Sequence, residues 1–210
     1  MTDASSEQIN RQELRNRSIL IDKVHTFWIR NVLEKSFEPG GKLKASWQFR
    51  PEMVPASKTK QDSQTAPPDT HDEIVKVFDQ SGQKLIILGK TGAGKTTCLL
   101  ELAQGLLGLA ERDVNQPIPV VLNLSTWKES FISFESWVIE ELRLKYQTPG
   151  RISQPWLDED RLTLLLDDLD ELRPIERPAC VKAINRFLHN HECGIAVCCQ
   201  NEEYLQLEER

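Results

Sequence analysis

One segment of the chain has the residue types and spacing of a loop that binds phosphate groups. It consists of Gly89, Lys90, Thr91, Gly92, Ala93, Gly94, Lys95 and Thr96, and matches G-x-x-x-x-G-K-[ST] in full. Glycines allow backbone torsions that other residues avoid, so successive amide N–H groups can converge on phosphate oxygens. A helix starting near Lys95 would point its positive end at the same anion. We expect Lys95 to neutralise the outer phosphates, Thr96 to bind Mg²⁺, and Thr97 to belong to the same nucleotide-binding set.

A second candidate site is a cluster of four carboxylates, Asp167, Asp168, Asp170 and Glu171, directly after the apolar run Leu164–Leu166. Ligands of parallel α/β sheets bind at the carboxyl ends of strands, where the phosphate loop is also expected. Asp167 is therefore predicted to hold Mg²⁺ through water. Glu171, or Asp170, is predicted to orient or deprotonate an attacking water. An acidic helix start would explain Asp170 and Glu171, but four clustered acids repel unless a cation lies among them.

The spacing of the two sites indicates which nucleotide is bound. A strand and a helix pair lie between them, and an extra acid follows Asp167, as in the P-loop division with a dedicated catalytic glutamate. The Asn-Lys-x-Asp sequence of guanine-specific switch proteins does not occur. We therefore expect ATP rather than GTP.

Histidines and cysteines near the C-terminal end suggest a metal site that we consider and discount. His189, His191 and Cys193 match no common zinc spacing. Cys198 and Cys199 fall on an expected buried strand, where cysteine behaves as a small hydrophobic residue.

Short apolar runs alternate with helical periodicity from residue 84 onward. Four strands separated by helices predict a parallel sheet covered on both faces, in an α/β fold. We expect strands at Lys84–Leu88, Ile118–Leu124, Leu162–Leu166 and Gly194–Cys199, and helices at Lys95–Glu111, Phe134–Tyr146 and Glu176–His189.

The N-terminal part differs from the rest in composition. Residues 1–60 carry 11 Lys and Arg against 7 Asp and Glu, whereas the remaining 150 residues carry 15 against 25. A helix is predicted from Arg11 to Phe37, with an apolar face formed by Leu20, Val24, Phe27, Trp28, Val32 and Leu33. This basic helix could bind a membrane surface or a partner helix, but we favour docking on the main domain. The expected division is a helical segment at 1–56, a linker at 57–70 and the domain at 71–210.

Composition also restricts the classes of protein. No run approaches the ~18 apolar residues of a membrane span, and the N-terminus lacks a signal-peptide core. Five irregularly spaced cysteines are typical of reduced thiols, so we expect a cytoplasmic protein. An acidic main domain argues against a nucleic-acid groove as its primary surface.

With both motifs in place, LTLLLDDLDEL and GKTGAGKTT together resemble the NACHT-domain NTPases of the signal-transduction ATPase (STAND) group. IVKVFDQSGQKLIILG, PIPVVLNLSTW and IAVCCQNEEYLQL are similar to the strand surroundings of bacterial, notably cyanobacterial, members, and KVHTFWIRNVLEKSF is similar to a helix that precedes the domain. The resemblance runs from about Arg17 to the C-terminus. It implies a three-layer P-loop NTPase of the ASCE type and an ATP- and Mg²⁺-dependent signalling switch, coupled to effector or repeat domains. It also implies that the fourth strand lies beside the phosphate-loop strand.

Three departures from the family pattern modify this expectation. Asp168 stands where the family prefers a small residue, and Gln200 where it commonly has a sensor arginine. The chain ends at Arg210, before the expected fifth strand, lid and winged helix, so we interpret the domain as incomplete and its phosphate-loop strand as an open edge prone to self-association. We therefore expect weak hydrolysis or none. A non-catalytic nucleotide- or partner-binding remnant, and a small P-loop kinase or transferase, remain as alternatives.

Overall fold

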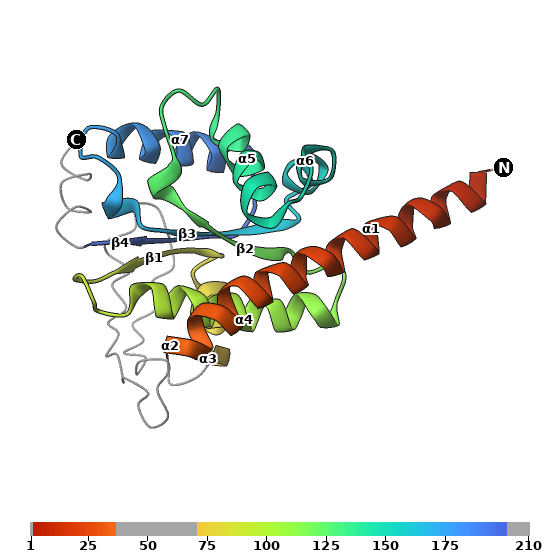
Figure 1. Ribbon diagram of the computed structural model, residues 1–210, viewed down its shortest axis with the longest axis horizontal. Helices are drawn as coiled ribbons and strands as arrows, with labels where there is room; N and C mark the ends of the chain where they lie inside the picture. Colours follow the sequence, from red (N-terminus) through yellow and green to blue (C-terminus); the bar gives the residue numbers. More distant parts are fainter. Residues whose placement is uncertain (1, 37–70, 201–210) are drawn as a thin grey trace.

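The structure is a computed structural model that describes residues 2–36 and 71–200. The expected linker at 57–70 lies outside these residues. Figure 1 shows the elements, and their bounds follow in chain order. They are α1 (Thr2–Val24), the π-helix η1 (His25–Leu33), α2 (Glu34–Ser36), α3 (His71–Gln80), β1 (Lys84–Leu88), α4 (Lys95–Arg112), β2 (Ile118–Asn123), the 3₁₀ turn η3 (Leu124–Thr126), α5 (Phe134–Tyr146), α6 (Gly150–Asp158), β3 (Leu162–Asp167), the 3₁₀ turn η4 (Leu169–Glu171), α7 (Arg177–Asn190) and β4 (Ile195–Cys199).

The four strands form one parallel sheet in the order β1-β4-β3-β2. Helices α3 and α4 cover one face, and α5, α6 and α7 cover the other (Figure 1). This arrangement confirms the predicted α/β fold with a parallel sheet covered on both faces. The fourth strand also lies beside the first, as the resemblance implied.

The sheet is the centre of the hydrophobic core. All six residues of β3 are buried, and Leu164, Leu165 and Leu166 have no exposed surface. A strand covered by helices on both faces has no side that meets water, which explains why its sequence is an apolar run rather than an alternation. Predicted and observed bounds of the strands, α4, α5 and α7 agree to within one residue.

The N-terminal helix docks on the domain, as we favoured from the sequence. The Arg17 side chain is 3% exposed and donates hydrogen bonds to the carbonyl oxygens of Ala110 (2.9 Å) and Gln116 (2.6 Å). These carbonyls lie in the last turn of α4 and just beyond it, where helix carbonyls lack partners within the helix. Arg17 therefore caps the helix that follows the phosphate loop.

The apolar face predicted for this helix is wrong at one position. Phe27 is 47% exposed, whereas Ile29 is fully buried. The buried positions Val24 and Ile29 are five residues apart, which matches the i→i+5 hydrogen bonding of the π-helix that begins at His25. The wider turn rotates Phe27 out of the interface. The helix also begins at Thr2 rather than at Arg11.

One outer strand of the sheet, β2, is capped by a tyrosine. The Tyr146 hydroxyl donates to the carbonyl of Val121 (2.7 Å) and accepts from the N–H of the same residue (3.2 Å). It also accepts from the indole N–H of Trp28 in the π-helix (2.8 Å). One hydroxyl thereby uses its donor and both acceptor positions, and helix α1 runs along the same strand (Figure 1).

Helix α6 was not predicted. Its sequence, GRISQPWLD, begins with glycine and contains Pro155, whose missing N–H and bulky ring disfavour an internal helical position. Burial of Trp156 (3% exposed) and Leu157 (0%) offsets this cost, because each buried side chain contributes about 1.5–3 kcal/mol.

Candidate nucleotide site at the carboxyl edge of the sheet

The predicted phosphate loop connects strand β1 to helix α4. Gly92 and Gly94 have φ angles of +75° and +87°, a region that costs other residues about 1–2 kcal/mol. Gly94 is also the N-cap residue of α4. These two positions require the glycines that the motif supplies. Lys90, Thr91, Gly92 and Ala93 are exposed, so a ligand can reach the loop from solvent.

The first glycine of the loop is needed for close packing. A Cβ atom at Gly89 would lie 3.2 Å from the Cβ of Ala93 and 3.3 Å from the Cγ of Lys95. The lysine can therefore fold back against the loop. Its ammonium lies 3.3 Å from the carbonyl oxygen of Gly89 and 3.4 Å from that of Lys90. Thr96 and Thr97 follow in the first turn of α4 and are half-buried.

The acidic segment begins at the end of strand β3. Asp167 is 3% exposed, and its Oδ1 accepts a hydrogen bond from the backbone N–H of Asp168 (3.0 Å). Asp168 has a φ of +61°, a left-handed conformation that Asp and Asn adopt more readily than most residues other than glycine. Its Oδ2 accepts from Nδ2 of Asn123 at the end of β2 (2.7 Å).

The carboxyl group of Asp168 has a raised pKa. Burial and then the negative charges of Asp167, Glu171 and Asp170 raise its pKa to about 6. The hydrogen bond from Asn123 opposes this rise but does not offset it. Asp168 therefore carries part of the electrostatic cost of grouping four acids at one strand end.

The other two acids belong to the turn η4 and face different surroundings. Oδ2 of Asp170 accepts a hydrogen bond from Nε2 of Gln200, 2.6 Å away. Oδ1 of Asp170 is buried and has no hydrogen-bond partner among the described residues. Glu171 is exposed and lines a cleft of about 680 Å³. The cleft is lined by Ser125, Trp127, Lys128, Glu129, Ser130, Glu171, Leu172, Arg173 and Glu176.

The four carboxylates do not converge on one point. Across residues 2–36 and 71–200, no group of three or more His, Cys, Asp or Glu side chains is arranged to hold a metal ion. Asn123 and Gln200 each donate a hydrogen bond to one of these acids, which offsets part of the repulsion among them. Asp167 is left as the single acid of the segment that is both almost fully buried and at the strand end.

Strand register brings the phosphate loop and the acidic segment together. Ile87 of β1 is paired with Cys198 of β4, and Leu166 of β3 with Val197. Asp167 is thus level with Cys198, whose Sγ lies 3.6 Å from the carbonyl oxygen of Lys95. The phosphate loop, Gln200 and Asp167 therefore occupy one edge of the sheet.

Two residues near this edge were not identified from the sequence. Asn123 ends an apolar strand with a polar side chain at the carboxyl edge, and this signal could have been recognised. Lys145 gives no such signal. Burial lowers the pKa of Lys145, and the negative charges of Glu141, Asp167 and Asp168 oppose this effect. The ammonium of Lys145 lies 4.4 Å from the ring centre of Trp28.

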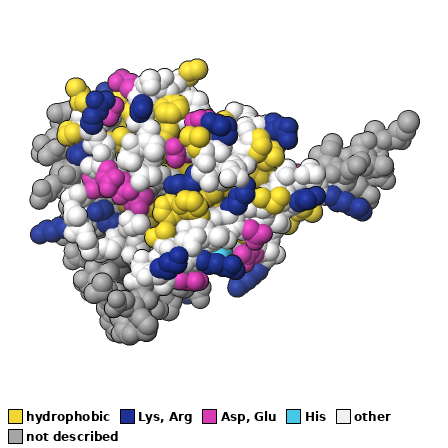
Figure 2. All heavy atoms as spheres, in the orientation of Figure 1, with side chains coloured by type: hydrophobic (Ala, Val, Ile, Leu, Met, Phe, Trp, Pro, Cys, Tyr) yellow, Lys and Arg dark blue, Asp and Glu magenta, His cyan; other side chains and the backbone are white. Residues whose placement is uncertain are grey.

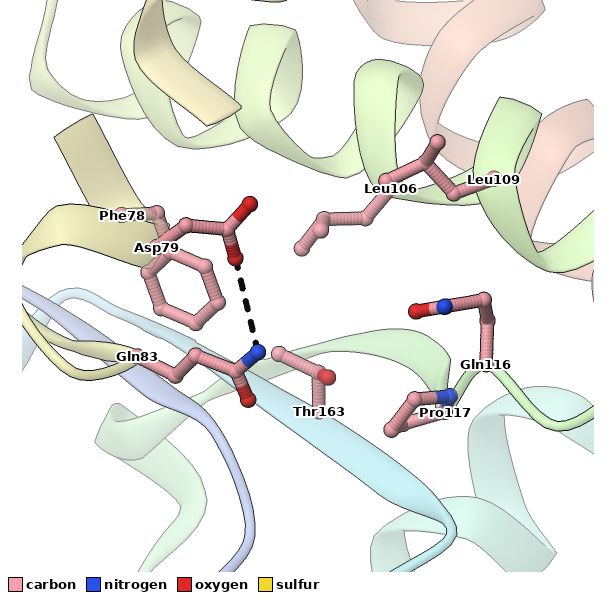
Figure 3. Close-up of a pocket in the computed structure, with 8 residues that line it drawn as sticks. All are labelled: Phe78, Asp79, Gln83, Leu106, Leu109, Gln116, Pro117 and Thr163. Carbon is pink, nitrogen blue, oxygen red and sulfur yellow. Dashed lines mark hydrogen bonds between the residues drawn. The ribbon is translucent and has the colours of Figure 1, made fainter. Parts of the chain in front are cut away.

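A second cavity, of about 230 Å³, lies at the opposite edge (Figure 3). Gln83 precedes β1, Pro117 precedes β2 and Thr163 is near the start of β3, so these residues mark the amino ends of the strands. Gln83 donates a weak hydrogen bond to Asp79 at one side of the cavity (3.4 Å; Figure 3). This cavity is separate from the phosphate loop.

The histidine and cysteine residues that we considered as a metal site have packing and hydrogen-bond contacts with neighbouring side chains or are buried. The His191 ring stacks on Phe187 with centroids 4.3 Å apart, and its Nδ1 lies 3.0 Å from Oδ1 of Asp160. Cys193, Cys198 and Cys199 are buried.

The surface charge on the visible face is mixed. Lys and Arg side chains are scattered among Asp and Glu on the face seen in Figure 2, rather than gathered in one stripe.

The described residues thus define an α/β protein with a four-stranded parallel sheet and a polar, glycine-rich carboxyl edge. None of the helices in the described ranges has the length and apolar character required to cross a membrane. Comparisons with protein-family models, with curated proteins and with solved structures found no match.

Proposed function

We propose that this chain is an ATP-binding, Mg²⁺-dependent switch of the P-loop NTPase class, of the ASCE type, resembling NACHT-domain proteins. The observation that carries the proposal is the juxtaposition at one sheet edge of a loop with left-handed Gly92 and Gly94 and the buried carboxylate of Asp167. The strand order supports it, because β4 separates the two segments and lies beside the phosphate-loop strand.

The residues fit a magnesium nucleotide in chemical terms. The exposed loop offers amide N–H groups and the ammonium of Lys95, whose hydrogen bonds among the described residues are long ones to two backbone carbonyls. Asp167 and Thr96 are the oxygen donors proposed to hold Mg²⁺, which when bound neutralises phosphate charge. Glu171 is exposed in a cleft whose lining includes neither the phosphate loop nor Asp167, and it is proposed to orient or deprotonate the attacking water.

The position of Gln200 favours weak turnover. Its amide group donates a hydrogen bond to Asp170, so one of its two N–H donors is already engaged by that carboxylate. Glutamine also supplies no positive charge to the transition state, whereas an arginine can contribute ~10³–10⁵ in rate. A second candidate function, a module that binds nucleotide without hydrolysing it, is favoured by this same hydrogen bond.

The proposal is tested by calorimetric titration with ATP and Mg²⁺. We expect Lys95→Ala to weaken binding by about tenfold to 150-fold, since hydrogen bonds to charged groups contribute about 1.5–3 kcal/mol. Lys84→Ala is the matched control, because Lys84 is an exposed lysine at the opposite end of β1.

Equal affinity of the wild type and Lys95→Ala would overturn the site assignment. GTP in place of ATP tests the base preference. Phosphate release separates a hydrolase from a non-catalytic binder, and formation of ADP without free phosphate would indicate the kinase or transferase alternative.

A further inference from the structure

The first residue of helix α7 holds the turn that carries Glu171. The guanidinium of Arg177 donates from Nη2 to the carbonyl oxygen of Asp170 (2.7 Å) and from Nε to that of Leu172 (2.9 Å). These two carbonyls belong to the residues immediately before and after Glu171. The planar guanidinium thus binds both sides of a single residue.

The location of Arg177 is unfavourable for the helix itself. Arg177 is the first residue of α7, and the first turn contains no acidic residue. A cation at a helix N-terminus opposes the helix dipole by about 0.3–1 kcal/mol. Its hydrogen bonds to the preceding turn give a reason for its presence that helix stability does not.

The remaining contacts of the turn involve its backbone and its other side chains, and within residues 71–200 no hydrogen bond of the Glu171 side chain is described. Leu169 and Leu172 are 4% and 3% exposed, so both anchor the turn in the core. Gln200 holds Asp170, and the N–H of Glu171 donates to the carbonyl of Asp168 (3.1 Å). The backbone of Glu171 is therefore fixed while its carboxylate faces the cleft.

We propose that Arg177 is a positioning residue that fixes the backbone of Glu171 and thereby aims its carboxylate at the attacking water. This inference rests on the proposed function, because it requires Glu171 to act on bound nucleotide. The two hydrogen bonds described for Arg177 are to backbone carbonyls of residues 170 and 172, so we expect its removal to lower turnover and to leave nucleotide affinity unchanged.

The experiment compares Arg177→Ala and Arg177→Lys with Arg186→Ala. Arg186 is an exposed arginine of the same helix, so its removal changes the helix charge equally. Single-turnover phosphate release gives the rate, calorimetry gives the Kd for ATP with Mg²⁺, and amide hydrogen exchange reports the opening of turn η4.

We expect Arg177→Ala to lower the rate at least tenfold, to keep Kd within twofold, and to speed exchange at the amides of Glu171 and Leu172. Arg177→Lys should restore only part of the rate, because an ammonium cannot bind two carbonyls in the guanidinium geometry. In a Glu171→Gln background, Arg177→Ala should cause no further loss.

An unchanged rate in Arg177→Ala, or a loss of affinity as large as the loss of rate, would overturn the positioning role. If the wild-type chain binds no nucleotide, the proposed function fails, and hydrogen exchange still decides whether Arg177 holds the turn. Faster exchange in Arg186→Ala as well would indicate a general loosening of α7 and refute the specific contact.

Discussion

Replacing Asp168 with asparagine should stabilise the protein, and the gain should depend on pH. The side chain carries a raised pKa of about 6 against an ordinary value of 3.8. An amide at this position carries no charge, and its oxygen can still accept the hydrogen bond from Asn123. Asparagine also tolerates the observed φ of +61° well.

The size of the effect follows from linkage between proton binding and folding. A shift of about two pKa units corresponds to about 3 kcal/mol. Asp168 is partly exposed to solvent, so screening reduces this to about 1–1.5 kcal/mol. The folded state binds the proton more tightly than the unfolded state, so wild-type stability falls as pH rises from about 4 through 6. Above pH 6 the penalty is complete.

Urea denaturation without nucleotide or Mg²⁺ measures the difference. Asp168→Asn should be about 1–1.5 kcal/mol more stable than the wild type at pH 7.5, and nearly equal to it at about pH 3, below both pKa values. The control is Asp22→Asn, an exposed carboxylate on α1, which should differ from the wild type by less than about 0.5 kcal/mol at both pH values. The reasoning is refuted if Asp168→Asn shows the same difference at both pH values or is destabilising at pH 7.5.

Three further predictions concern the site and the docked helix. Asp167→Asn should weaken the Mg²⁺ dependence of ATP binding, whereas Glu171→Gln should leave binding intact and remove any phosphate release; wild-type turnover by Glu171→Gln would reject Glu171 as the base. Phosphate release by the wild-type chain should be very slow and should rise at least tenfold in Gln200→Arg, and brisk release by the unmodified chain would contradict the role given to position 200. Arg17→Ala should lower the free energy of unfolding by about 2–4 kcal/mol in urea titrations, because it leaves the carbonyls of Ala110 and Gln116 without their buried donor; a loss below about 1 kcal/mol would show that water replaces it.

Local patterns predicted most of the sheet and the helices around it. The β3 run could be recognised because a strand buried on both faces must be apolar throughout. The glycines at 92 and 94 could be recognised because their positive φ angles exclude most other residues. In both cases the structural requirement acts within one short segment, so the residue types of that segment show it directly.

The features that the sequence did not predict have a different physical origin. A π-helix changes the helical period, so the pattern that placed Phe27 in the interface used the wrong repeat. The contacts of Asn123 and Arg177 depend on strand register and on the orientation of helix α7 against turn η4. No local pattern encodes those distances. The partner of each acid at the strand end was therefore beyond the reach of sequence reasoning.

The hydrogen bonds of Tyr146 to strand β2 have a consequence for how the protein unfolds. Tyr146 bonds both backbone groups of Val121 on one side and the indole of Trp28 on the other. Peeling away the N-terminal helix would remove one of the three bonds that fix this hydroxyl and uncover the strand that α1 runs along. The helix and the sheet should consequently melt as one cooperative unit. A shortened protein that begins after residue 36 would expose backbone donors and acceptors able to recruit a strand from a neighbouring molecule.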